Sequence, residues 1–79
     1  MDAMTEIANR AVADYGFRQA ALWSPGDVAA RWELSAQETA VLKGALHDAL
    51  DELPIPVEPD DVPAQQERIV GIIRQALAG

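Results

Sequence analysis

The one histidine of the chain lies among acidic residues, in the order His47-Asp48-Ala49-Leu50-Asp51-Glu52. His47 and Asp51 are four residues apart, so in a helix they would share a face, where they could hold a metal ion or orient the imidazole. A third strong ligand at a recognisable spacing is missing, and a solvated histidine near the negative end of a helix explains the pattern. We therefore expect no metal ion and no cofactor.

Residue types for other chemistry are few. Ser24 and Ser35 are both explained as helix caps, and the five glycines are scattered rather than gathered in a phosphate-binding loop. The chain has no cysteine and no Asp-Ser-Leu attachment motif of a carrier protein. The sequence therefore predicts a protein that is not an enzyme.

Length and charge restrict the class of protein further. The chain has 79 residues and a net charge of −7. This length suits one domain, which at about 60% surface burial would be marginally stable alone. The charge disfavours nonspecific binding to nucleic acid or anionic membranes, and no apolar run approaches the roughly 20 residues of a membrane span. With no signal peptide apparent, we expect a small cytoplasmic domain that associates with a partner.

Most of the net negative charge arises in residues 48–61, where six of the thirteen acids occur without a base. Three prolines in the same stretch predict an extended connector over residues 54–59, with Ile55 and Val57 lying on the surface of the helices. The acids make this stretch the most distinctive surface that the sequence offers. They are candidate partner contacts: Asp48, Asp51, Glu52, Glu58, Asp60 and Asp61.

The rest of the chain has the apolar spacing of helices. We expect a first helix over residues 5–15 with Gly16 as its stop or as a kink. Residues 17–23 would either continue this helix or form a separate turn, and a short helix is expected over residues 25–32. Ser35 and Glu38 form a capping box that opens a helix to about residue 53. Asp60 or Asp61 would cap the last helix. The sequence thus predicts an all-α, compact domain of four to five helices: a core at 1–53, the acidic proline connector at 54–59, and an amphipathic helix at 60–78.

Four large apolar residues are further candidates for partner contacts. Trp23 and Trp32 are expected to anchor the core, but either would be an interface hot spot if it were partly exposed. In the last helix, Ile69 and Ile73 belong to an apolar face that could serve self-association. We therefore expect a protein partner, which is either a larger enzyme or a second copy of the chain.

Residues 27–43 have the outline of a helix-turn-helix, with a short helix, a tight turn and a Ser-capped helix. In that reading four residues would face the major groove of DNA: Ala36, Gln37, Thr39 and Lys43. Glu33 stands where a turn glycine is usual, and Glu38 adds negative charge to the second helix. A helical hairpin used only for packing is the favoured explanation of the pattern, so nucleic acid is not the expected partner.

The middle of the chain also resembles a known family. A Ser24-Pro25 helix start, a short helix ending at Trp32, and then Leu34-Ser35-Ala36-Gln37-Glu38 are similar to the small all-helical alpha subunit of two-subunit extradiol ring-opening dioxygenases. Similar domains occur in precursors of some modified peptides, where they dock on the modifying enzyme. The resemblance covers about residues 15–50. It implies a non-catalytic, partner-binding role, and no catalytic residue carries over because a proline connector and a further helix replace the segment that covers the active site.

These observations favour a helical protein–protein interaction module, either an accessory subunit or a leader-like domain of a peptide precursor. With no cysteine and only four Ser or Thr, the chain lacks substrate residues for lanthionine or azole chemistry, although backbone N-methylation of its apolar end would need none. A small helix-turn-helix transcription regulator is the first alternative. The second is an acidic antitoxin or nucleic-acid mimic that binds a basic protein.

Overall fold

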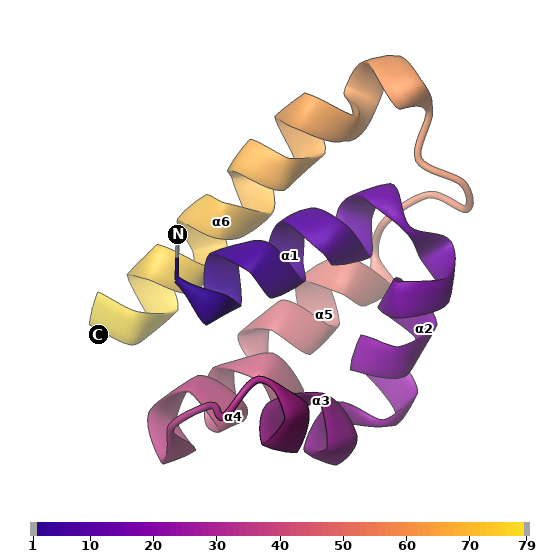
Figure 1. The fold of residues 1–79 in the computed structure, drawn as a ribbon. Coiled ribbons are helices and arrows are strands. Elements are labelled where there is room, and N and C mark those ends of the chain that lie inside the picture. Colours follow the sequence, from indigo (N-terminus) through magenta and orange to yellow (C-terminus); the bar gives the residue numbers. More distant parts are fainter. Residues whose placement is uncertain (1, 79) are drawn as a thin grey trace.

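The computed structural model describes residues 2–78, which form six α-helices and a short 3₁₀ helix without any strand. The elements are α1 (Ala3–Ala13), α2 (Tyr15–Trp23), α3 (Pro25–Arg31), α4 (Ala36–Lys43), α5 (Ala45–Asp51), η1 (Pro59–Asp61) and α6 (Val62–Ala78). Helices α1 and α6 pack side by side and α5 lies against both (Figure 1). Helix α2 contacts α1 and α5, and α3 connects α2 to α4, which packs on α5. The expected all-α class, with a proline-containing segment before the last helix, is confirmed.

Side-chain caps set several of the helix boundaries. Asp2 caps α1 by accepting a hydrogen bond from the Thr5 amide at 2.8 Å. Asp14 caps α2 by accepting a hydrogen bond from the Phe17 amide at 3.2 Å, so α1 ends and α2 begins at this residue. The expected stop at Gly16 is therefore wrong, because Gly16 lies in the first turn of α2.

The turn between α3 and α4 combines a confirmed cap with an unexpected one. The Ser35 hydroxyl accepts from the Glu38 amide at 3.1 Å and the Glu38 carboxylate accepts from the Ser35 amide at 2.9 Å, which confirms the capping box. Ser24, by contrast, makes no side-chain cap at the start of α3. Glu33 has a φ of 53° and closes α3, since the following Leu34 amide donates to the Ala29 carbonyl.

The helix predicted to run unbroken from residue 36 to residue 53 is divided at Gly44. The ψ of Gly44 is −98°, outside the helical region, so α4 ends before Gly44 and α5 begins after it. A Cβ atom at this position would lie 3.1 Å from the Ala40 carbonyl oxygen. Glycine therefore permits a close approach that turns α5 relative to α4.

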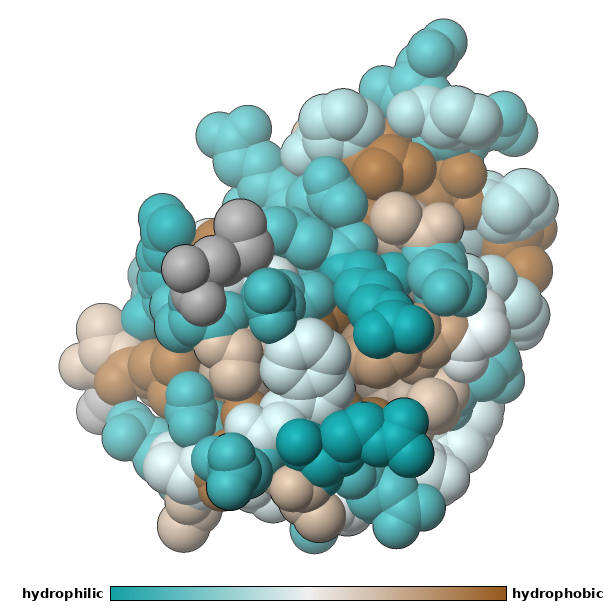
Figure 2. Space-filling model, viewed as in Figure 1, coloured by the Kyte–Doolittle hydropathy of each residue, from teal (hydrophilic) through white to brown (hydrophobic). Residues whose placement is uncertain are grey.

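The core is formed where α1, α4, α5 and α6 turn their apolar faces inward. Its most deeply buried large side chains are Met4, Ile7, Val12, Leu42, Leu46, Leu50 and Ile69. Ile69 and Ile73, expected as a surface for self-association, are both buried in this core and offer no surface to a partner. On the face seen in Figure 2, hydrophilic side chains cover most of the surface and apolar atoms show in separate places.

The connector runs from the end of α5 to η1, and its two apolar residues, Ile55 and Val57, differ in exposure. Val57 is buried against the helices, as expected, whereas the side chain of Ile55 is 70% exposed. Leu53, at the start of the connector, is also buried. None of the helices in the described part of the chain combines the length and apolar character needed to cross a membrane.

Candidate functional site

Three large apolar side chains are exposed in the described residues, and all three line one groove. They are Tyr15 at 43%, Ile55 at 70% and Trp23 at 68% exposure. The groove lies between α2, the end of α5 and the connector, and its volume is about 210 Å³. We call it the α2–α5 groove; its lining is Tyr15, Arg18, Gln19, Leu22, Trp23, Leu50, Asp51, Leu53 and Ile55.

Trp23 is exposed but held in one orientation. Its indole N–H donates to the Gln19 side-chain carbonyl, one turn earlier in α2, at 2.9 Å. The ring also meets the imidazole of His47 edge to face, with 6.1 Å between centroids. Because His47 belongs to α5, the two contacts fix the indole between the helices while most of its surface stays in water.

Arg18 forms the floor of the groove and is only 2% exposed. Its Nε donates to the Ala11 carbonyl at 3.2 Å, and its Nη1 donates to the Pro54 carbonyl at 3.0 Å. The guanidinium also lies 5.3 Å from the centre of the Tyr15 ring. Arg18 thus ties the connector to the junction of α1 and α2, and it places Ile55 at the edge of the groove.

One nitrogen of this guanidinium makes neither of these bonds. The hydrogen bonds of Arg18 use Nε and Nη1 and leave Nη2 outside them. Within residues 2–78, no fully buried side-chain nitrogen or oxygen lacks a hydrogen-bond partner. Arg18 is also among the residues that line the α2–α5 groove.

The structure divides the predicted acidic stretch into two groups. Asp51, the last residue of α5, lines the groove. Asp48, in the first turn of this helix, and Glu52, which follows it, are exposed. Glu58, Asp60 and Asp61 are exposed on the connector and η1 and do not line the groove. Trp23 and Asp51 therefore come together although they are far apart in the sequence.

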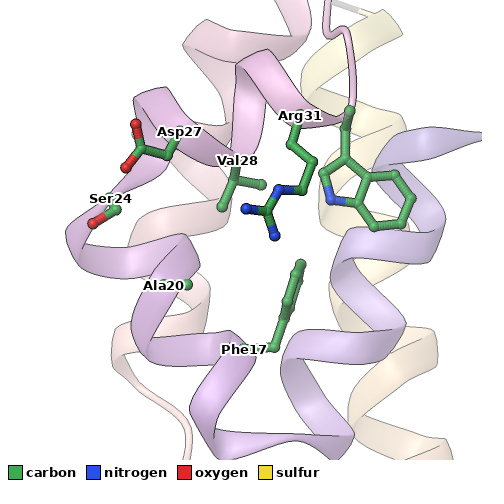
Figure 3. Close-up of a pocket in the computed structure, with 7 residues that line it drawn as sticks. Phe17, Ala20, Ser24, Asp27, Val28 and Arg31 are labelled. Carbon is green, nitrogen blue, oxygen red and sulfur yellow. The ribbon is translucent and has the colours of Figure 1, made fainter.

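Trp32, the other predicted anchor, belongs to a second surface. It is half-buried and packs edge to face on Phe17, with 6.4 Å between ring centroids, while the Arg10 guanidinium lies 4.6 Å from the centre of the Phe17 ring. A pocket of about 240 Å³ separates α2 from α3 here, and Figure 3 shows the Arg31 side chain pointing toward Phe17 across it. Asp27 is at its outer edge in the same view.

The residues of the DNA-binding alternative lie on α4, and two of them are engaged within the fold. The Gln37 amide donates to the Leu77 carbonyl of α6 at 3.1 Å, and the Thr39 hydroxyl donates to the Ser35 carbonyl at 2.8 Å. Ala36 and Lys43 are exposed. The hydrogen bond from Gln37 to the end of α6 indicates that α4 packs within the domain.

His47 and Asp51 remain the nearest approach to a metal-binding pair. Across residues 2–78, no group of three or more His, Cys, Asp or Glu side chains is arranged to hold a metal ion. The imidazole instead contacts the indole of Trp23.

Sequence reasoning missed Tyr15, Arg18 and Ile55 as parts of the groove. Tyr15 matched the apolar spacing of the first helix, and nothing in the sequence distinguishes Arg18 from an ordinary surface cation of a helix. Ile55 carried a signal, because prolines on both sides keep it out of a helix. A scan against family models, a search of curated proteins and a search of solved structures each found no match to this chain.

Proposed function

We propose that the chain is a non-catalytic protein–protein interaction module that docks on a larger partner enzyme through the α2–α5 groove. The observation that carries this proposal is the gathering of Tyr15, Trp23 and Ile55 around one hollow. Clustered exposed apolar side chains are typical of sites that a partner covers, and tryptophan is among the commonest hot-spot residues. The sequence resemblance to dioxygenase alpha subunits and peptide-precursor domains implies the same role.

The groove has two properties that suit a protein partner. Its volume of about 210 Å³ is smaller than the roughly 300–1,000 Å³ of pockets that enclose a small-molecule substrate, but it can receive one anchoring side chain. Trp23 is also oriented in advance by Gln19 and His47, which lowers the entropy lost when a partner binds.

A larger partner is favoured over a second copy of the chain. The apolar face of α6 that could have served a homodimer supplies Ile69 and Ile73 to the core. The large apolar side chains that are exposed within residues 2–78 line the groove, whose small size suits the reception of a projecting segment. An accessory subunit or a leader-like domain would use it in this way.

The test is a selection from a random peptide display library on the purified chain, followed by affinity measurements on variants. The proposal predicts peptides whose affinity falls at least about tenfold in Trp23→Ser and in Ile55→Ser, because both remove a hot-spot contact. Gln75→Ser, at an exposed position of α6, is the matched control and keeps the affinity. Circular dichroism checks that each variant is folded.

Two results would contradict the proposal. One is a library that yields no binder on the wild-type chain. The other is a set of binders with equal affinity for the wild type, Trp23→Ser and Gln75→Ser, since such peptides bind elsewhere on the molecule.

A further inference from the structure

The electrostatic surroundings of the α2–α5 groove restrict what can occupy it. Asp48, Asp51 and Glu52 bring three negative charges to α5 and its C-terminal cap, and no Lys or Arg occurs between residues 44 and 67. The one cation that lines the groove is Arg18, which is buried at its floor. The rim is therefore negative, and complementary charges on a partner would speed its encounter and select it against acidic competitors.

The size of the hollow restricts the occupant to a single apolar side chain. Its walls include Leu22, Leu50 and Leu53, and its exposed edge includes Trp23 and Ile55. An aliphatic or aromatic residue of a partner would fill this space, and the residues before and after it in the partner chain would then lie over the acidic rim.

The floor of the groove favours an extended segment. Arg18 already donates to two main-chain carbonyls, those of Ala11 and Pro54, and it lines the groove with a third guanidinium nitrogen, Nη2, that makes neither bond. A third main-chain carbonyl is the acceptor that any peptide can offer. In a helix the carbonyls are bonded internally, whereas in an extended segment they are free to accept.

We infer that the α2–α5 groove binds an extended basic segment of its partner, with one apolar side chain in the hollow and flanking Lys or Arg side chains beside Asp48, Asp51 and Glu52. This inference rests on the proposed function and specifies the chemistry of the partner. The Arg18 guanidinium holds a main-chain carbonyl of the segment, and the acids of α5 select its charge.

The experiment compares two triple variants with the same change of charge. The rim variant is Asp48→Asn, Asp51→Asn and Glu52→Gln; the control variant is Glu58→Gln, Asp60→Asn and Asp61→Asn. Peptides selected from the random library on the wild-type chain are the probes, and their affinities are measured at low and high salt. All six positions are exposed, and circular dichroism verifies folding.

The inference predicts peptides enriched in Lys and Arg around one apolar residue. Their affinity falls about tenfold in the rim variant at low salt and less than about threefold in the control variant, and the difference shrinks at high salt. Proline beside the apolar residue of a peptide excludes a helix and leaves the affinity within about threefold.

Other outcomes separate the inference from the function on which it rests. One such outcome is that the selected peptides require Trp23 for binding but are neutral or acidic, and another is that they bind both triple variants with equal affinity. Either result would contradict the basic character of the segment but not the docking function of the groove. Loss of binding on introduction of proline overturns the extended conformation. A selection without any Trp23-dependent peptide overturns the proposed function itself.

Discussion

Replacement of Arg18 tests how the groove is built. This residue is 2% exposed and joins two segments that are 36 residues apart through its bond to the Pro54 carbonyl, in addition to its bond to the Ala11 carbonyl. A hydrogen bond from a charged donor contributes about 1.5–3 kcal/mol. Because Arg18→Ala removes two such bonds and the packing of the side chain, we expect the free energy of unfolding to fall by about 3 kcal/mol.

Arg18→Met distinguishes hydrogen bonding from packing. Methionine keeps much of the side-chain volume and removes a buried charge, which in some proteins is neutral or stabilising. Here it leaves the Ala11 and Pro54 carbonyls without their donor, so we expect a loss of about 2 kcal/mol. Arg10→Ala is the matched control: this exposed arginine lies over Phe17, and its loss should cost less than about 1 kcal/mol.

The assay is urea unfolding followed by circular dichroism at 222 nm. A domain of this length is expected to have a free energy of unfolding of about 4–12 kcal/mol, so a 3 kcal/mol change moves the midpoint clearly. If Arg18→Met were as stable as the wild type, or if Arg10→Ala were as destabilising as Arg18→Ala, the two carbonyl bonds would not hold the connector.

Three further tests, with four substitutions, examine other parts of the fold. Glu33→Gly should raise the free energy of unfolding by up to about 1 kcal/mol, because glycine adopts the φ of 53° without strain; an unchanged or lower value would contradict this. In the same assay, Ile69→Ala should lower the free energy of unfolding by about 2–4 kcal/mol and Ile55→Ala by less than about 0.5 kcal/mol, because Ile69 is in the core and Ile55 is exposed. Equal losses in the two variants would contradict this assignment. Hydrogen bonds from Thr5 hold the pKa of Asp2 below its ordinary value of 3.8, so its stabilising charge is present above pH 3.8 and is lost as the pH falls through the lowered pKa. At neutral pH the free energy of unfolding of Asp2→Ala should be about 1 kcal/mol below that of the wild type. This difference should close on acidification; a difference that widens would contradict the prediction.

Local sequence signals predicted much of the helical framework. The Ser35 and Glu38 capping box depends on residues three positions apart, and it forms as expected. The break at Gly44 was missed, because the apolar spacing continues across it while the close approach to the Ala40 carbonyl appears only in three dimensions. Asp14 is a cap that could have been recognised, but the nearby Gly16 suggested a boundary two residues later.

The groove was less predictable because it depends on contacts between distant segments. Trp23 was expected to anchor the core, with an interface role if exposed; its exposure and its contact with His47 of α5 appear only in the folded chain. Arg18 looks like any helical surface cation until Pro54 is brought beside it. The acids of residues 48–61 were recognised as one stretch, but only the fold separates those at α5 from those at η1.

The most direct test of the docking groove uses the two indole N–H resonances of the chain in a ¹⁵N–¹H NMR titration with a peptide from the selection. Trp23 lines the groove and Trp32 lies on the other surface, so each reports on its own site. We predict that the Trp23 resonance shifts progressively until the chain is saturated with peptide, while the Trp32 resonance stays in place. Movement of Trp32 alone would contradict docking at the α2–α5 groove.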